Sequence, residues 1–176
     1  ILGLGVMGQM MAVLARHLGA SQIIASDCVP FRLEHAKKLG VDRLVDFRRE
    51  SLPQVVAQET NGEKADVVFV CPTTPEAFLE GIECAGRSSR VLLFMGPAAG
   101  TKLTVDMNKI YFDEIDLLSS YSCGPDDTRE ALRLIEAGVS TAPQMITHHF
   151  PLERIQEAVD LSRKAQDSLK IIIDID

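Results

Sequence analysis

The feature that most constrains this chain is a glycine pattern close to its first residue. The segment Gly3-Leu4-Gly5-Val6-Met7-Gly8 has the spacing G-x-G-x-x-G, after the apolar pair Ile1-Leu2 and before a helix predicted over residues 6–18. In a strand–turn–helix unit the first glycine permits a tight turn, the second leaves room for a pyrophosphate, and the third lets the helix pack closely. The helix N-terminus also favours an anion. The pattern therefore favours a phosphate-binding turn over an ordinary glycine-rich one.

The rest of the chain alternates short apolar runs with helical patterns. After the Ile1-Leu2 stub, strands are predicted over residues 22–26, 43–46, 66–71, 90–95 and 115–121, and helices over residues 30–39, 51–61, 74–86 and 106–111. This alternation is typical of a parallel sheet with helices on both faces. We therefore expect an α/β fold, a doubly wound Rossmann sheet of six parallel strands in the order 3-2-1-4-5-6.

The first predicted strand is unusually short. Only Ile1 and Leu2 precede the first glycine, whereas a buried strand usually has about five or six residues. We expect from this that the sequence begins inside its own first strand, and that so short a stub does not anchor the sheet.

The pattern changes after residue 124. A helix is predicted over residues 126–137, an extended segment over 144–150, an amphipathic helix over 151–165 and a last strand over 169–175. These elements exceed the six strands of the nucleotide fold. We therefore divide the chain into a dinucleotide-binding unit, residues 1–124, and a segment, residues 125–176, that belongs to a second domain largely outside this sequence.

Composition excludes several classes of partner. The net charge is −7, with 18 basic and 25 acidic side chains and no dense basic run, which argues against nucleic acid. The longest apolar runs, such as residues 67–70, are far too short to cross a membrane. The cysteines are not spaced as C-x-x-C pairs, so we expect free thiols in a reducing cytoplasm; they are Cys28, Cys71, Cys84 and Cys123.

An acidic residue closes the second predicted strand. Asp27 follows the third glycine by about twenty residues, the position from which a carboxylate binds the adenosine ribose hydroxyls of NAD and repels the 2′-phosphate of NADP. Asp27 could also cap the helix that begins at Pro30, and the two roles are compatible. Arg32 could accept a 2′-phosphate, but stacking on adenine beside Asp27 is the favoured interpretation. We therefore predict a preference for NAD.

Further cofactor contacts are expected where parallel strands end, because ligands bind at their carboxyl ends. Ordinary turn chemistry is the alternative at each of these positions. Besides Val6 and Met7 in the turn, the candidates are Cys71 and Thr73 after the fourth strand, Met95 and Gly96 after the fifth, and Ser120 and Tyr121 after the sixth.

The histidine pair His148-His149 is the one segment that suggests a metal. Adjacent strand residues point to opposite faces of a sheet, so the pair is badly placed to hold one ion. No Cys, Asp or Glu stands close by in the sequence. We predict no metal site within this chain.

Taken together, these residues resemble the coenzyme domain of the zinc-containing medium-chain alcohol dehydrogenases, with the sorbitol-, polyol- and threonine-dehydrogenase-like branch nearest. The resemblance covers nearly the whole chain. It rests on Ile1 to Gly8, Asp27, Arg32-Leu33, the run from Ala36 to Gly40, Ser120-Tyr121-Ser122, Arg129 to Leu132, Ile146-Thr147-His148, Pro151 to Ile155, Ala158 and Lys170 to Ile173. The family often has Gly-Gly where this chain has Ser88-Ser89.

The resemblance implies an oxidoreductase that passes a hydride between a secondary alcohol or polyol and NAD. Zinc is implied only for the full-length protein, through residues that this chain does not contain, so no catalytic residue is assigned and the chain alone is expected to be inactive. Lys170 is implied to reach a cofactor phosphate. Self-association is implied through the edge strand, residues 115–121. A zinc-free quinone-reductase-like enzyme and a non-catalytic nucleotide sensor remain the alternatives.

Overall fold

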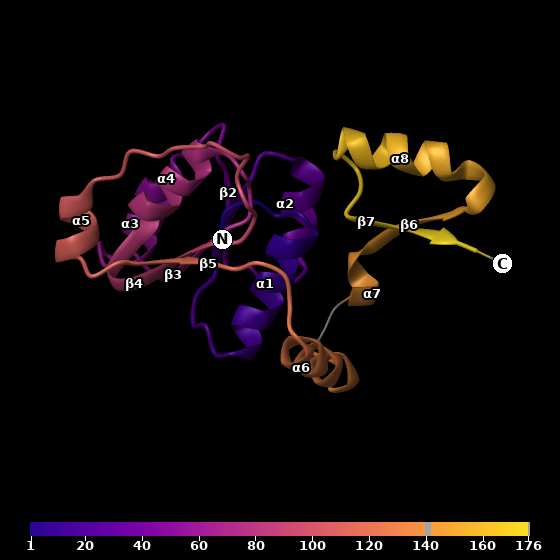
Figure 1. The fold of residues 1–176 in the computed structure, drawn as a ribbon, viewed down its shortest axis with the longest axis horizontal. Helices are drawn as coiled ribbons and strands as arrows, with labels where there is room; N and C mark the ends of the chain where they lie inside the picture. Colours follow the sequence, from indigo (N-terminus) through magenta and orange to yellow (C-terminus); the bar gives the residue numbers. More distant parts are fainter. Residues whose placement is uncertain (140–141, 176) are drawn as a thin grey trace.

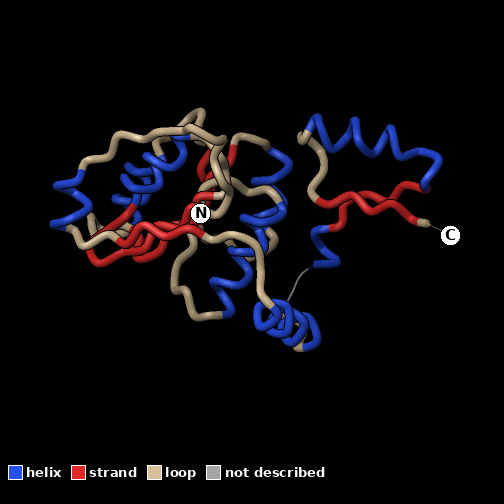
Figure 2. Tube along the Cα trace, viewed as in Figure 1, coloured by secondary structure: helices blue, strands red, loops and turns tan. Residues whose placement is uncertain are grey.

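The computed structural model describes residues 1–139 and 142–175. Its N-terminal part alternates strands and helices along the chain (Figures 1 and 2). The helices are α1 (Val6–His17), α2 (Pro30–Lys37), α3 (Leu52–Glu59), α4 (Pro75–Cys84) and α5 (Met107–Phe112), and the strands are β1 (Ile24–Asp27), β2 (Arg43–Asp46), β3 (Ala65–Val70), β4 (Ala85–Leu93) and β5 (Asp116–Ser119).

The strands form one parallel sheet whose two parts meet at Leu2. β1 pairs with β2, and β3, β4 and β5 pair in that order, all in parallel. Leu2 makes parallel bridges to Ser26 on one side and to Val70 on the other. The resulting order, β2-β1-Leu2-β3-β4-β5, is the predicted 3-2-1-4-5-6 order, so the predicted fold class is confirmed.

The two-residue stub is held on both of its edges. The Ile1 amine donates to the Ile24 carbonyl at 2.8 Å, and the Leu2 amide donates to the Phe69 carbonyl at 2.8 Å. The Leu2 carbonyl accepts from the Cys71 amide at 3.0 Å, and the Leu2 side chain is buried. The expectation that so short a stub does not anchor the sheet is therefore wrong, because ladder bonds to both neighbours compensate for its length.

Two apolar clusters fill the space between the sheet and its helices. The larger joins α3 and α4 to the strands and contains Leu2, Val45, Leu52, Val55, Val56, Val68, Val70, Phe78, Ile82, Cys84, Ala85, Val91 and Ile115. The smaller joins α1 and α2 to β1 and contains Leu4, Ala12, Ile23, Ala25, Ala36 and Val41. Because Leu2 and Leu4 belong to different clusters, the glycine turn begins between the two packed layers.

Local chemistry explains several element boundaries. Proline begins α2 and α4, where its fixed φ suits a helix and its missing amide costs nothing. Thr74 caps α4, its hydroxyl accepting from the Ala77 amide at 3.3 Å. Ser88 has a φ of +54°, a left-handed conformation that glycine adopts more easily. Ser88 therefore accepts the cost of this conformation, about 1–2 kcal/mol for a residue with a Cβ.

Some predicted boundaries are wrong. The helix predicted to reach residue 86 ends at Cys84, and β4 begins at once with Ala85. Gly86 lies so close to the segment that precedes β3 that an added Cβ would sit 2.2 Å from the Glu63 carbonyl oxygen. Ser51 precedes α3 without a side-chain capping bond. Gln144, predicted as extended, lies in a short helix instead.

The C-terminal elements form a separate, two-stranded parallel sheet (Figure 1). The helix α6 leads to α7, and β6 and β7 then pair with η1 and α8 between them. Their bounds are α6 (Pro125–Glu136), α7 (Ala142–Met145), β6 (Ile146–Pro151), η1 (Leu152–Arg154), α8 (Ile155–Lys164) and β7 (Lys170–Asp174). None of the described helices is long and apolar enough to cross a membrane.

Candidate functional site

A cleft of about 820 Å³ opens beside the glycine turn. It lies at the carboxyl ends of β1, β2 and β3, on both sides of the Leu2 strand position, where α/β folds bind their ligands. The predicted site residues that line it are Gly3, Gly5, Val6, Met7, Gly8, Asp27, Arg32, Cys71 and Met95. Backbone and side chains from distant parts of the sequence therefore share one surface.

Each glycine of the turn has a distinct structural reason. Gly3 has a φ of +84°, in the left-handed region. A Cβ on Gly8 would lie 1.9 Å from the Gly3 carbonyl oxygen, so the helix can approach the turn only without a side chain there. A Cβ on Gly5 would meet nothing within 4 Å. The fold therefore does not require glycine at this position, but a side chain there would enter the cleft.

The helix α1 begins with free amides that face this opening. Its N-cap is Gly5, which has no side chain to cap the first turn. The first amides of a helix lack intrahelical partners and carry part of the positive end of the helix dipole. The arrangement of an open glycine and an uncapped helix start suits a phosphate group.

Asp27 ties the glycine turn to the end of β1. Its carboxylate is buried, with one oxygen accepting from the Leu4 amide at 2.8 Å and the other from the Cys28 and Val29 amides at 2.7 and 2.9 Å. The N-cap of α2 is Val29, without a side-chain bond, so the suggested capping role for Asp27 is wrong. The carboxylate instead fixes the backbone on both sides of the cleft.

Arg32 completes this corner of the cleft. Its guanidinium lies 3.4 Å from an Asp27 oxygen, and its Nε is a buried donor that has no hydrogen-bond partner among the described residues. Behind it, the buried Gln9 amide donates to the Leu4 carbonyl at 2.9 Å and accepts at 2.6 Å from His35. An unpaired buried donor beside a ligand-sized cleft is a position that a bound polar group would satisfy.

Five predicted site residues do not line this cleft: Thr73, Gly96, Ser120, Tyr121 and Lys170. β5 ends at Ser119, so Ser120 and Tyr121 follow the strand, and the Tyr121 side chain is 99% exposed. Lys170 begins β7 in the separate C-terminal sheet. Thr73, Gly96, Ser120 and Tyr121 follow the carboxyl ends of strands, as the sequence predicted, and Lys170 lies in the predicted last strand. The sequence did not predict how far each loop extends from the cleft.

Sequence reasoning missed one wall of the cleft. Phe47, which is 49% exposed, follows β2 directly and lines the cleft beside β1. The rule of strand ends would have found it, because β2 closes with Asp46 next to Asp27. Thr74 and the first half of α4 supply further residues that were missed, among them Glu76, Ala77 and Glu80. Burial raises the pKa of the Glu80 carboxyl.

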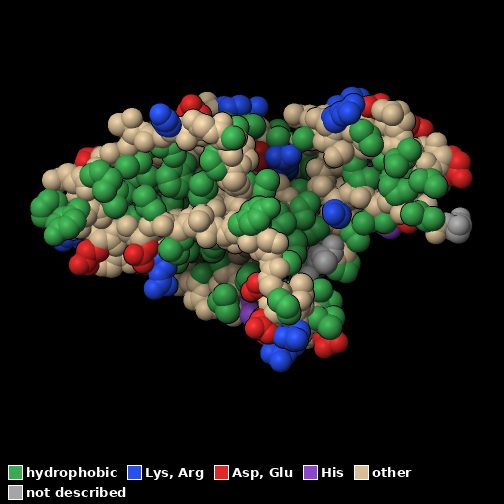
Figure 3. All heavy atoms as spheres, viewed as in Figure 1, with side chains coloured by type: hydrophobic (Ala, Val, Ile, Leu, Met, Phe, Trp, Pro, Cys, Tyr) green, Lys and Arg blue, Asp and Glu red, His purple; other side chains and the backbone are tan. Residues whose placement is uncertain are grey.

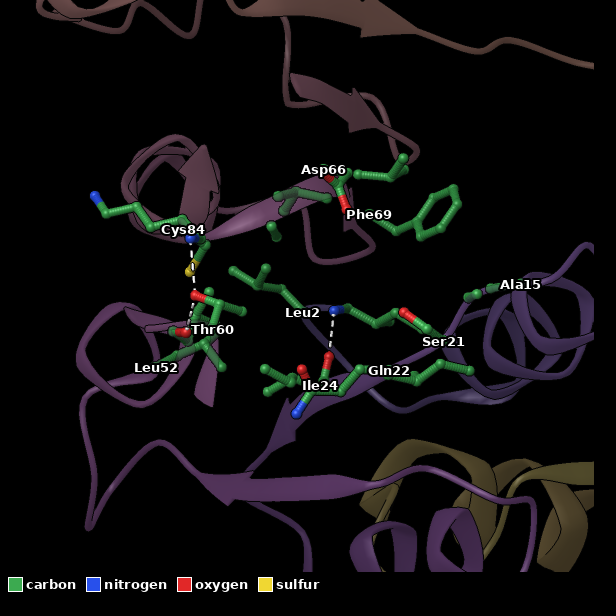
Figure 4. A pocket seen from close by; sticks show the side chains of 18 of the residues that line it. Leu2, Ala15, Ser21, Gln22, Ile24, Leu52, Thr60, Asp66, Phe69 and Cys84 are labelled. Atoms are coloured by element: carbon green, nitrogen blue, oxygen red, sulfur yellow. Dashed lines mark hydrogen bonds between the residues drawn. The ribbon is translucent and has the colours of Figure 1, made fainter. Parts of the chain in front are cut away.

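A second cavity, of about 450 Å³, lies on the other side of Leu2 (Figure 4). Its walls come from the amino-terminal parts of β1 and β3 and from α3, with Ile24, Leu52, Phe69 and Cys84 around it. The Ile1 backbone nitrogen lies beside it and donates to the Ile24 carbonyl. Ligand sites in open α/β sheets lie at the opposite, carboxyl ends of the strands, so the cleft at the glycine turn is the stronger candidate.

In the part of the chain that the structure describes, no three His, Cys, Asp or Glu side chains gather as a metal site. His149 lies 3.0 Å from an Asp174 oxygen, whereas His148 contacts the Thr147 hydroxyl at 3.0 Å. The two histidines therefore have different partners. All four cysteines are free thiols.

The sheet order and the glycine turn at its centre define a Rossmann domain of the dehydrogenase type. The sequence model described as zinc-binding dehydrogenase matches residues 6–137. This chain belongs to the zinc-binding dehydrogenase family.

Relatives agree with this assignment. The L-threonine 3-dehydrogenase of Chromobacterium violaceum is 30% identical over 175 residues, which cover 99% of this chain and 50% of the relative. The crystal structure of benzyl alcohol dehydrogenase from Acinetobacter calcoaceticus superimposes with a TM-score of 0.91 at 26% identity, over 99% of this chain and 48% of that one. The alcohol dehydrogenase of Thermus sp. ATN1 has the same fold, with a TM-score of 0.91 at 23% identity over 99% and 50% of the two chains. The chain spans about half the length of the curated relatives it matches.

Two glycine substitutions test which glycine of the turn the fold requires. Gly8→Ala forces a Cβ against the Gly3 carbonyl and should lower the free energy of unfolding by roughly 1–3 kcal/mol, the usual cost of overpacking. Gly5→Ala meets open space and should leave thermal stability within about 0.5 kcal/mol of the parent chain. Denaturant unfolding measures both values. Equal losses in the two variants would contradict this account of the turn.

Proposed function

We propose that this chain is the NAD-binding portion of a zinc-dependent oxidoreductase that transfers a hydride between a secondary alcohol or polyol and NAD. The observation that carries the proposal is Asp27. Its carboxylate lies in the cleft beside the glycine turn and is bonded to the Leu4 amide of that turn. A ribose-binding acid and a phosphate-binding turn are thus held together by one hydrogen bond.

The residues of the cleft fit this cofactor. The open position at Gly5 and the uncapped start of α1 would hold the pyrophosphate. Asp27 would accept from the ribose hydroxyls, while Phe47 and Arg32 would flank the adenine. Cys71 and Met95, which line the cleft at the ends of β3 and β4, would border the nicotinamide. NAD supplies the hydride chemistry, and these residues bind and orient it.

The catalytic residues of the whole protein are assigned to sequence outside these 176 residues. A zinc ion there would act as a Lewis acid on the alcohol oxygen. We further propose that residues 125–176 belong to that catalytic domain and that Lys170 reaches a cofactor phosphate when the domains close. The free thiols suit a cytoplasmic enzyme.

Turnover tests the enzymatic part of this proposal. The full-length protein should reduce NAD with secondary alcohols or polyols, and L-threonine belongs in that panel because its hydroxyl is secondary and several relatives bear its name. The 176-residue chain should show no turnover even with zinc added. Activity of the chain alone would contradict the division of roles. An inactive but folded full-length protein would favour a nucleotide sensor, and a zinc-free active one a quinone-reductase-like enzyme.

Cofactor titration tests the role of Asp27. The chain should bind NAD more tightly than NADP, because the carboxylate accepts from ribose hydroxyls and repels a 2′-phosphate. Asp27→Asn should weaken NAD binding by about tenfold, the loss of one charge-assisted hydrogen bond, and should weaken NADP binding less. Calorimetric titration gives the four constants, with thermal melting to show that the variant is folded. Tighter binding of NADP by the parent chain would refute the preference.

We also propose that β5 pairs with a second copy of the protein. β5 is at the end of the sheet order, and Leu117 and Leu118 are 40% and 45% exposed. Figure 3 shows hydrophobic side chains gathered on the part of the molecule that carries α5 and β5. An exposed apolar edge strand tends to recruit another strand.

The measurement is the mass in solution by light scattering. The protein should be a dimer or larger, and Leu118→Lys should shift it toward the monomer because a charged edge strand resists pairing. The matched control is Leu132→Lys, because Leu132 is also exposed but lies on α6. This variant should leave the mass unchanged. A monomeric parent protein would defeat this proposal.

A further inference from the structure

We infer that Asp46 determines which dinucleotide the cleft accepts, by holding Arg48 and Arg49 away from the 2′ position of the adenosine ribose. The inference rests on the proposed function, since it assumes a dinucleotide in this cleft. It assigns a specificity role to a carboxylate that lies outside the glycine turn and that does not itself line the cleft.

Asp46 occupies the position next to Asp27 in the sheet. β1 and β2 are parallel neighbours, and Asp27 pairs with Asp46 at the last position of their register. Both carboxylates therefore lie at the ends of their strands, at the same edge of the sheet. They lie beside the corner of the cleft that Asp27 and Arg32 form, which we call the ribose corner. Phe47, the next residue, lines the cleft, so the chain passes directly from the Asp46 carboxylate to the cleft wall and then to Arg48.

Two arginines are held by this one carboxylate. Arg48 donates through Nε to one Asp46 oxygen at 2.9 Å and through its terminal nitrogen to the other at 2.7 Å, a fork-to-fork pair. Arg49 Nε lies 3.5 Å from the same carboxylate. Asp46 is 14% exposed and Arg48 52%, so the carboxylate is largely covered while the guanidinium reaches solvent. Hydrogen bonding from Arg48 lowers the pKa of Asp46 to about 2, so the pair is ionised at neutral pH.

The charge of Arg48 reaches the ribose corner. Arg48 directly follows Phe47, which lines the cleft, and its partner Asp46 is paired with Asp27 in the sheet. Arg48 therefore lies within electrostatic range of the residue proposed to bind the ribose. Arginine is the side chain best suited to a phosphate, through the same fork that here engages a carboxylate.

The corner thus contains three arginines and two carboxylates. Asp27 holds Arg32, and Asp46 holds Arg48 and Arg49. Every cation has a carboxylate partner, and a 2′-phosphate would have to compete with those partners for it. Removing the charge of Asp46 would release two arginines at once, whereas Asp27 would stay in place for the ribose. Loss of the Asp46 charge alone would therefore leave Arg48 and Arg49 available to bind a 2′-phosphate.

The test is the substitution Asp46→Asn, which keeps the size of the side chain and an acceptor oxygen but removes the charge. NADP should bind about tenfold more tightly than to the parent chain, comparable to the effect of one opposite charge nearby, and NAD should change by less than about twofold. The gain should shrink between low and high salt because it is electrostatic. Glu157→Gln is the matched control, since Glu157 forms the same fork-to-fork pair with Arg154 in the C-terminal segment and neither residue lines the cleft.

Two further variants test whether Arg48 causes the gain and guard against a variant that fails to fold. Asp46→Asn combined with Arg48→Gln should lose most of the NADP gain, which assigns it to the released guanidinium. Asp46→Ser, whose hydroxyl can still accept from the Arg48 amide, replaces Asp46→Asn if that variant does not fold in a melting experiment. Unchanged NADP affinity in a folded, NAD-binding variant would overturn the inference. Failure of the parent chain to bind either dinucleotide would overturn the proposed function instead.

Discussion

The sheet depends on one strand position, at residues 1–2, that pairs with neighbouring strands on both sides. Leu2 bridges Ser26 and Val70, and without these bridges β1-β2 and β3-β4-β5 would be separate sheets. Its side chain enters the larger apolar cluster, while Gly3 turns the backbone away immediately after it. The position of the glycine turn is therefore set by strand pairing beneath it, and the direction of α1 follows from the turn.

The chemistry of the cleft is organised by backbone amides and by carboxylates at strand ends. Asp27 accepts from amides before and after it in the sequence, so its charge is stabilised by the same turn that it orients. Asp46 performs a comparable task for the arginines of the following loop. Each of these two carboxylates has backbone amides or guanidinium groups beside it, which offset the cost of placing a charge at a partly buried site.

The sequence predicted those features that depend on short patterns. The glycine spacing, the acid at Asp27 and the order of the strands all follow from local rules that tertiary contacts did not override. The boundary at Cys84 was missed because a close approach between Gly86 and Glu63 decides it, and that contact is distant in sequence. Phe47 was missed although it directly follows a strand end, whereas the pairing of Asp46 with Arg48 was missed because loop conformation, rather than residue type, decides it. The strand predicted over residues 115–121 extends too far for the same reason, since β5 ends at Ser119.

The position of the cleft has a mechanical consequence. Asp27 and Phe47 come from the β1-β2 part of the sheet, and Cys71 and Met95 from the β3-β4-β5 part. These two parts of the sheet lie on either side of the Leu2 strand position, and the cleft runs across it. A ligand lying along the cleft would contact both parts at once. Because such a ligand binds the folded domain and not the unfolded chain, its binding free energy would add to the stability of both parts together.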